Sequence, residues 1–276
     1  IIPSRWFGGG KGLDDFRREM LNDNHIRVLV DYENASDCFP GVDIAGGVCY
    51  FLWDRDNPGL CDVVNIRNNE TMHSVRALNE FDTFIRHDQA ASIVRKVCAF
   101  GEPMMSNMVS SRKPFGLPTV ARPQESGDIL LRWQNGEGPY RRDEITVGRE
   151  LIDKWKVITS YVGYDHAGNP GKDGKRRVFS KIDILPPGTI CTETYLVVGN
   201  FDTEQEAKKL VAYMKTLFFR FLVAQCMYSH HITKEAYRLV PIQDFSLSWT
   251  DEKLYAKYGI TDEEIKFIES MVRPME

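Results

Sequence analysis

Blocks of apolar residues divide the first sixty residues into short elements. Residues 13–21 place apolar side chains at helical spacing, which predicts an amphipathic helix. Residues 26–32 form a mainly apolar run, as in a strand buried on both faces of a parallel α/β sheet. A second strand is predicted for residues 48–53, and residues 1–7 have the pattern of a strand end whose partners precede the chain. The first sixty residues therefore predict part of an α/β domain.

The middle of the chain predicts a different architecture. A strand at 61–67 and a helix at 89–99 lead into short runs rich in Val, Ile, Tyr and Thr, separated by Gly, Pro and Asn turns. These runs, at residues 128–133, 155–164, 177–185 and 189–198, predict antiparallel or mixed β structure. We therefore divide the chain into residues 1–85 and a second domain of residues 86–276.

Capping signals mark the helices of the C-terminal part. Thr203 and Glu206 have the spacing of a capping box, and apolar residues then recur every three or four positions to about residue 229. At 1.5 Å per residue this predicts one helix of about 40 Å, which would serve as core or as a spine between domains. Thr250 and Thr261 open two further short helices, the second again with a capping box.

The charge of the chain is distributed unevenly. The net charge is −4, but residues 86–185 carry 17 Lys and Arg against 12 Asp and Glu, while the remainder carries 18 against 27. A polyanion responds to the local field, so the middle segment is the predicted contact surface. The six cysteines lie far apart without metal-ligand spacing, and the apolar stretch at 210–227 is interrupted by charged residues. We expect reduced thiols, no membrane span and a cytoplasmic protein.

Motifs for chemistry are missing from the sequence, whereas basic loops are frequent. No G-x-S-x-G, G-x-G-x-x-G or Cys/His nucleophile pattern occurs, so no catalytic or metal-ligating residue is predicted. The loop at residues 165–177 combines glycines with four Lys or Arg side chains. One further loop carries an Arg-Lys pair at 112–113, and another carries an Arg-Arg pair at 141–142. Such residues suit contact with DNA, although a solubilising hairpin tip is the alternative. The predicted DNA contacts are Arg112, Lys113, Arg141, Arg142, Lys172, Lys175, Arg176 and Arg177.

A family resemblance rests on the order of several short segments. Ile2-Pro3-Ser4, the helix after it, residues 26–31 and the Cys-Phe-Pro-Gly-Val segment at 38–42 resemble the last third of adenine-N6 DNA methyltransferases of the TaqI and Eco57I type. In that family a Phe before the last strand lies against the flipped adenine. The resemblance implies this stacking role for Phe39, with ordinary core packing as the alternative.

The remaining chain resembles the target recognition domain of combined bacterial restriction-modification enzymes. This resemblance rests on residues 110–117, 156–161, 184–195 and the Pro-Ile-Gln-Asp element near residue 242. It implies the end of a Rossmann-like methyltransferase sheet followed by a mixed α+β, duplex-DNA-binding domain. The family's Asn-Pro-Pro-Tyr motif and S-adenosylmethionine loop are absent, so we expect that cofactor only in the parent enzyme. The expected partners of this chain are double-stranded DNA and the upstream methyltransferase or nuclease domains of the same protein.

Two other classes of function remain open. The chain could be an interaction module, similar to a specificity subunit, whose long helix docks restriction or methylation subunits. Exposed apolar surface on residues 210–222 would distinguish this class. It could also be a self-contained enzyme of unknown chemistry, for which methyl transfer or cleavage by the chain alone would be the evidence.

Overall fold

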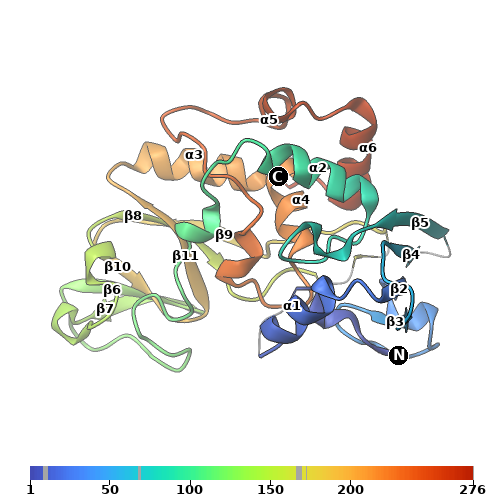
Figure 1. Ribbon diagram of the computed structural model, residues 1–276. Helices are drawn as coiled ribbons and strands as arrows, with labels where there is room; N and C mark the ends of the chain where they lie inside the picture. Colours follow the sequence, from blue (N-terminus) through green and yellow to red (C-terminus); the bar gives the residue numbers. More distant parts are fainter. Residues whose placement is uncertain (9–11, 68–69, 166–169, 172, 276) are drawn as a thin grey trace.

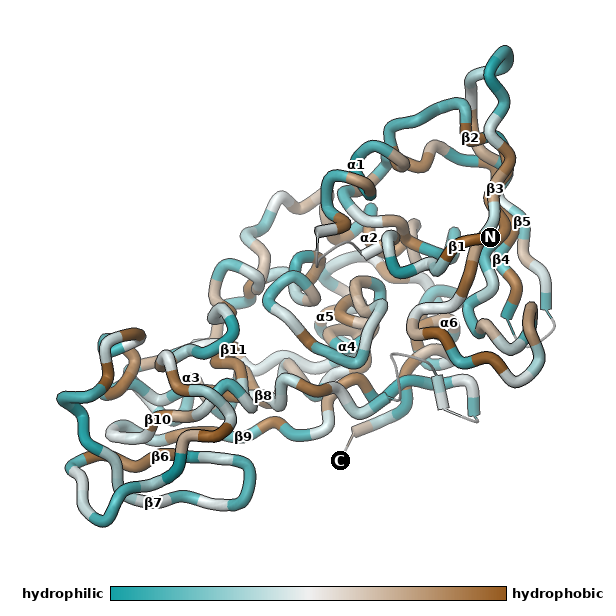
Figure 2. The backbone as a smooth tube through the Cα atoms, turned by 90° about the horizontal axis from the view of Figure 1, so that it is seen from below, coloured by the Kyte–Doolittle hydropathy of each residue, from teal (hydrophilic) through white to brown (hydrophobic). Residues whose placement is uncertain are grey.

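Three groups of secondary structure follow one another across the molecule (Figure 1). The structure is a computed structural model and describes residues 1–8, 12–67, 70–165, 170–171 and 173–275. A sheet at the N-terminal end, a helical unit in the middle and a pair of small sheets at the other end form an elongated molecule, which Figure 2 shows from below. Each group has its own cluster of buried apolar residues.

The N-terminal sheet has five strands in the order β1-β3-β2-β4-β5. Its central strand β2 pairs in parallel with β4 and antiparallel with β3, while β1 and β5 pair antiparallel at the two edges. Helix α1 packs on this sheet through Leu21, beside Trp6 and Phe7. The elements are β1 (Ile2–Pro3), α1 (Asp14–Asn22), β2 (Ile26–Tyr32), β3 (Val48–Trp53), β4 (Cys61–Arg67) and β5 (Glu70–Arg76).

The double-sheet unit consists of two three-stranded sheets that enclose a shared core. One sheet has the order β10-β6-β7, with β10 parallel to β6, and the other has the antiparallel order β11-β8-β9. Leu131 of the first sheet and Ile158 of the second are buried in the same cluster. The strands are β6 (Ile129–Trp133), β7 (Gly136–Tyr140), β8 (Trp155–Ser160), β9 (Ile182–Leu185), β10 (Thr189–Cys191) and β11 (Tyr195–Phe201).

The helical unit joins the two β parts. Its core is dominated by apolar residues of α3 and α4, and α3 lies against β8 and β11 (Figure 1). Helices α2 and α6 pack together on the side that faces the N-terminal sheet. The helices are α2 (Asp88–Cys98), α3 (Glu204–Lys215), α4 (Leu217–Gln225), α5 (Asp251–Tyr258) and α6 (Asp262–Met271).

The single long helix predicted after residue 203 is wrong, because the helix breaks at Thr216. This residue has φ −61° and ψ 152°, an extended conformation, and its hydroxyl caps the amide of Phe219. The carboxylate of Asp251 also accepts hydrogen bonds from the amides of Leu217 and Phe218, at 3.0 and 2.8 Å. The apolar period continues across the break because both helices bury their apolar faces in the same core.

Most other predicted elements are confirmed, with corrections among the β strands. The mixed α and β class, the strands at 26–32, 48–53 and 61–67, and the capping box at Thr261 agree with the structure. The predicted strand at 189–198 divides into β10 and β11, and that at 177–185 begins only at Ile182. The edge strands β5 and β7 were not predicted. The Gly-Glu-Gly-Pro-Tyr sequence of β7 has low β propensity, and its proline is tolerated at an edge.

We predict that Asp251→Ala lowers the free energy of unfolding by about 1–2 kcal/mol, because two amides at the first turn of α4 lose their acceptor. Asp262→Ala, which removes an exposed acidic residue from the first turn of α6, is the control and should cost less than about 1 kcal/mol. Urea denaturation measures both values. Equal midpoints for the two variants would contradict this account of the helix break.

Candidate functional site

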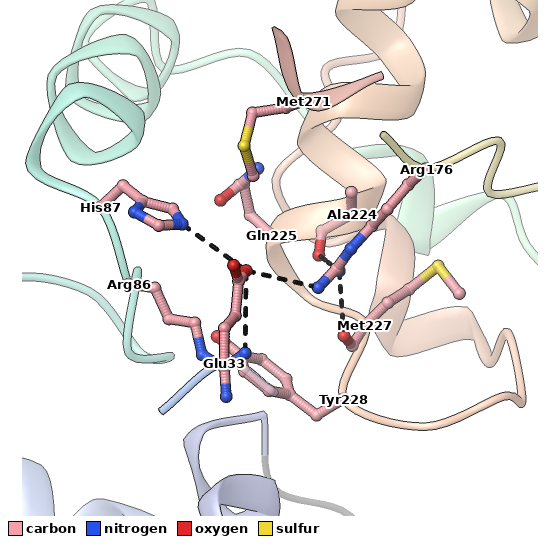
Figure 3. A pocket seen from close by; sticks show the side chains of 9 residues that line it. All are labelled: Glu33, Arg86, His87, Arg176, Ala224, Gln225, Met227, Tyr228 and Met271. Atoms are coloured by element: carbon pink, nitrogen blue, oxygen red, sulfur yellow. Dashed lines mark hydrogen bonds and ion pairs between the residues drawn. The ribbon is translucent and has the colours of Figure 1, made fainter. Parts of the chain in front are cut away.

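A cluster of buried charged residues lies where the N-terminal sheet meets the helical unit (Figure 3). Glu33 follows β2, and Arg67 ends the parallel neighbour β4, so both lie at the carboxyl edge of the sheet. Arg86 and His87 come from the segment just before α2, and Arg176 comes from the loop before β9. With Asp31 these five residues form what we call the buried ion-pair cluster.

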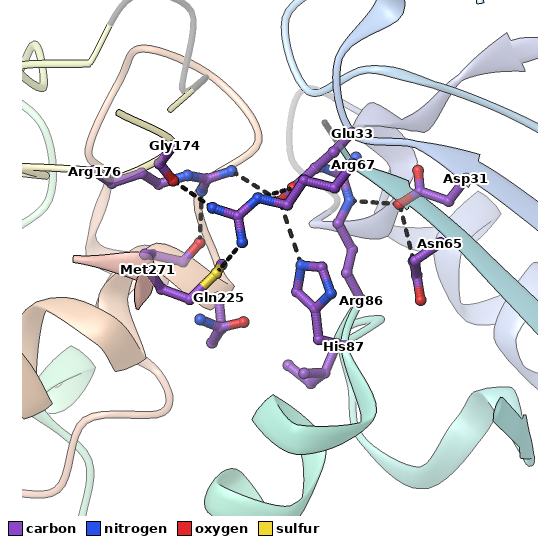
Figure 4. Close-up of polar contacts among 12 residues, drawn as sticks. Asp31, Glu33, Asn65, Arg67, Arg86, His87, Gly174, Arg176, Gln225 and Met271 are labelled. Carbon is purple, nitrogen blue, oxygen red and sulfur yellow. Dashed lines mark hydrogen bonds and ion pairs between the residues drawn. The ribbon is translucent and has the colours of Figure 1, made fainter. Parts of the chain in front are cut away.

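Glu33 is the centre of this cluster. One of its carboxylate oxygens lies 3.5 Å from Nε2 of His87 and 3.6 Å from Arg176. The other lies 3.2 Å from Nε of Arg67. The side chain of Glu33 is only 5 % exposed, so these contacts form away from solvent. A single carboxylate therefore connects the sheet to both the α2 segment and the loop before β9 (Figure 4).

Asp31 forms the second part of the cluster, inside the sheet. Its carboxylate lies 2.9 Å from Nε of Arg86 and accepts hydrogen bonds from Ser4 at 2.9 Å and Asn65 at 3.3 Å. Arg86 also reaches Glu33 at 3.8 Å and donates to the carbonyl of Gly46. Arg86 thus links both carboxylates to the loop between β2 and β3.

The pKa values of the two carboxyl groups shift in opposite directions. Burial raises the pKa of Asp31, and the attraction of Arg86 opposes this shift without cancelling it. Burial would also raise the pKa of Glu33, but His87 and the neighbouring guanidinium groups outweigh it and hold the pKa well below its usual range. Glu33 is therefore ionised at neutral pH, where its charge compensates the surrounding cations.

The pocket beside Glu33 is too small for a substrate. It is bounded by the cluster, by Gln225 and Tyr228 of the helical unit and by Met271, and its volume of about 10 Å³ has room for about one water molecule. Ligands of open α/β sheets usually bind at the carboxyl ends of parallel strands, which is where this cluster lies. In the described part of the chain, that position is filled by protein side chains.

The structure corrects the expectation of an exposed Arg176. Its guanidinium is buried, lies 3.6 Å from Glu33 and donates to the carbonyl of Ala224 at 3.1 Å. The carboxylate of Asp165 accepts hydrogen bonds from the amides of Arg177 and Val178, at 3.0 and 2.8 Å, and so fixes the turn that follows Arg176. Val178 has a φ of 74°, which is unfavourable for a β-branched residue. This turn directs Arg176 inward and makes it part of the structure.

The other predicted contact residues lie mainly at the surface. Arg141 pairs with Asp143 at 2.8 Å, and Arg142 binds both carboxylate oxygens of Asp153 at 2.7 Å. Arg177 is half-buried with its guanidinium 4.7 Å from the centre of the Tyr164 ring, and Lys175 is also half-buried. Lys172 lies outside the described residues. Phe39 is 39 % exposed in the loop after β2, so packing in the core is not its main role.

An open groove runs along the double-sheet unit where it meets the helical unit. It has a volume of about 610 Å³ and is lined in part by Arg112, Gln134, Tyr161, Lys181, Glu193 and His231. We call these six residues the groove residues. A second pocket, of about 160 Å³, is lined by Arg5 and Tyr228 and shares Tyr161 and His231 with the groove. The Tyr161–His231 pair thus lies between a surface of the double-sheet unit and one of the N-terminal part.

Sequence reasoning missed both the centre of the cluster and most of the groove residues. Asp31 and Glu33 are two positions apart, so a strand places them on one face. Two acidic residues at the end of an apolar strand were a usable signal for a buried charged cluster. The cations that meet them come from three distant segments, which no local pattern brings together. Among the described residues, no three or more His, Cys, Asp or Glu side chains are arranged to hold a metal ion, and none of the helices is long and apolar enough to cross a membrane.

Comparison with known proteins supports the predicted resemblance at the N-terminal end. Residues 1–39 match the Eco57I restriction-modification methylase family. An uncharacterised adenine-specific methylase of Mycoplasma pneumoniae is 33% identical over 60 residues, which cover 21% of this chain and 14% of that relative. The resemblance to adenine methylases of restriction-modification systems is confirmed for this part of the chain.

A solved structure gives a weaker likeness over most of the chain. The type IIG restriction endonuclease BpuSI aligns with 94% of this chain and 42% of its own, at 9% sequence identity. The TM-score of 0.32 is below the level that indicates a shared fold. Both relatives are much longer than the part that this chain matches.

We predict that Glu33→Gln lowers the free energy of unfolding by about 3 kcal/mol at neutral pH, because the buried arginines lose the charge that compensates them. The folded-state pKa of Glu33 is lowered, so its stabilising effect is present above the unfolded value of about 4.3 and disappears as pH falls through the folded value. The difference between wild type and variant should therefore shrink on acidification.

Glu80→Gln is the matched control for this variant. Glu80 pairs with Arg95 at the surface, where the Arg95 side chain is 57% exposed, and its loss should cost less than about 1 kcal/mol. Chemical denaturation of wild type and both variants at several pH values between neutral and about 3 measures the three stabilities. A difference between Glu33→Gln and wild type that stays constant down to pH 3 would show that the charge of Glu33 is not what stabilises the cluster.

Proposed function

We propose that this chain is the part of a restriction-modification enzyme that binds a specific duplex DNA sequence, and that the whole enzyme methylates adenine at N6. The observation that carries the proposal is the match of residues 1–39 to the Eco57I restriction-modification methylases. DNA is the substrate that this family context implies. The basic balance of residues 86–185 and a groove lined by cations, an amide and aromatic rings support a DNA-binding role for the rest of the chain.

In this proposal DNA lies against the groove and the neighbouring pocket. Arg112 and Lys181 line the groove on the double-sheet unit, while Arg5 lines the adjoining pocket on the side of the N-terminal sheet. Phosphate contacts from such residues set register and affinity, and side chains at base edges set specificity. Phe39, in a loop of the N-terminal part, is the proposed stacking residue for an extruded adenine.

S-adenosylmethionine belongs to the proposed activity of the whole enzyme, and the carboxyl edge of the N-terminal sheet does not fit it. At the carboxyl edge of the parallel strands β2 and β4 the available volume is about 10 Å³, and charged side chains of the protein occupy the position. We therefore propose that the cofactor binds to another part of the enzyme. This chain would contribute the DNA contacts.

The alternative of a docking module lacks the surface that it requires. The large apolar residues of α3 and α4 between 210 and 222 are buried or half-buried in the core of the chain itself, including Leu210, Met214, Phe218 and Leu222. A helix buried in this way has no apolar face to offer another subunit. The proposal of DNA recognition is therefore favoured over docking through this segment.

We predict that the double variant Lys113→Ala/Lys175→Ala weakens binding to duplex DNA of any sequence. Each lost phosphate contact should make the negative slope of log K against log salt shallower by about 0.9. The slope of the double variant should therefore be shallower than that of wild type by about 2. Fluorescence anisotropy with random-sequence duplexes across a salt series measures this. The control Lys208→Ala/Lys266→Ala removes the same charge from exposed positions on α3 and α6. Equal slopes for both double variants would remove Lys113 and Lys175 from the interface.

A further inference from the structure

We infer that Arg112 is a specificity-determining residue that reads the major-groove edge of a guanine. This inference rests on the proposed function, because it assigns one base contact within the DNA interface. Arg112 lies in the loop before β6, at the groove, and its side chain is 57% exposed. Three features of its surroundings separate it from the other surface arginines.

The first feature is the anchor at one side of the guanidinium. Nε of Arg112 lies 3.0 Å from a carboxylate oxygen of Glu193, whose side chain is only 9% exposed. Glu193 is itself fixed, because its other oxygen accepts from the amide and the hydroxyl of Thr119 at 3.1 and 3.3 Å. The anchor engages Nε, and the described hydrogen bonds leave the two terminal amino groups of Arg112 without an acceptor.

The second feature fixes the plane of the side chain. The guanidinium carbon lies 5.0 Å from the centre of the Tyr161 ring, and this ring stacks on His231 with centroids 4.6 Å apart and planes at 28°. A guanidinium on an aromatic face, held at Nε by a carboxylate, has little freedom left to lose when it binds. Arg112 is therefore oriented before a ligand arrives.

The third feature is the rigidity of the loop that carries Arg112. The amide of Ser110 donates to the carbonyl of Val197 at 2.8 Å, and Phe115 is buried in the core of the double-sheet unit. Lys113 takes a φ of 64° between these two anchor points, which shapes the turn. The loop thus holds Arg112 on the sheet framework.

These features match the chemistry of guanine. Its major-groove edge presents two acceptors, O6 and N7, that suit the paired terminal amino groups of an arginine, and this is the commonest specific contact to DNA. Arg142 is different, because Asp153 already accepts from both of its terminal amino groups at 2.7 Å. A phosphate could also accept from Arg112, but a phosphate contact carries no sequence information. The two possibilities therefore predict different results.

Selection of duplexes from a random library by the 276-residue chain tests this inference. We expect wild type to select a preferred sequence that contains a guanine. At this position Arg112→Lys should lose roughly ten- to hundredfold of the discrimination between guanine and the other bases, since lysine keeps the charge but lacks the two-donor fork. The salt dependence should stay unchanged, because the charge is kept. Replacing that guanine by 7-deazaguanine, which lacks the N7 acceptor, should weaken wild type more than Arg112→Lys.

Arg95→Lys is the control, because Arg95 on α2 also pairs with a carboxylate, that of Glu80, and its side chain is likewise 57% exposed. Thermal unfolding of each variant shows that it is folded. We expect this control to select the same sequence as wild type. Arg112→Lys that retains the whole preferred sequence, or that weakens every sequence equally, would overturn the guanine contact and leave the proposed DNA recognition intact. A wild-type chain that selects no sequence at all would overturn both.

Discussion

The charge of Glu33 is the constraint on which the arrangement of this molecule depends. An ionised carboxylate buried at the end of β2 must be compensated, and the compensating cations come from three separate parts of the chain. The segment before α2 and the loop before β9 must therefore converge on the edge of the N-terminal sheet. With Asp31 included, two carboxylates face three arginines and a histidine, so removal of either acid enlarges a buried excess of positive charge.

This constraint also separates two roles for arginine in the same chain. Arg176 and its buried neighbours hold the sheet to the helical unit, whereas Arg112 is anchored through one nitrogen and exposed at a groove. The groove and the pocket beside it meet at Tyr161 and His231, close to where the N-terminal part and the double-sheet unit approach each other. The buried ion-pair cluster fixes the N-terminal sheet against the helical unit, which would hold the two sides of the proposed DNA interface at a constant spacing.

The sequence predicted the local elements better than their contacts. Apolar runs located β2, β3 and β4, and capping residues located the starts of α3, α5 and α6, because these signals lie within a few residues. The break at Thr216 depends on the distant carboxylate of Asp251, and the burial of Arg176 depends on Glu33, more than a hundred positions away. The basic loops made Arg112 a predicted contact, but its anchor Glu193 and its stacking partner Tyr161 follow other strands, β10 and β8.

We propose that duplex DNA binds along the groove, between the double-sheet unit and the N-terminal part. Amide hydrogen exchange of the chain with and without a bound duplex tests it most directly, because it reports where DNA covers the backbone. The account predicts slower exchange in the loop at 110–119, around Tyr161 to Tyr164 and at His231, with no change in α5 and α6. Slower exchange confined to α5 and α6, or none in these groove segments, would contradict it.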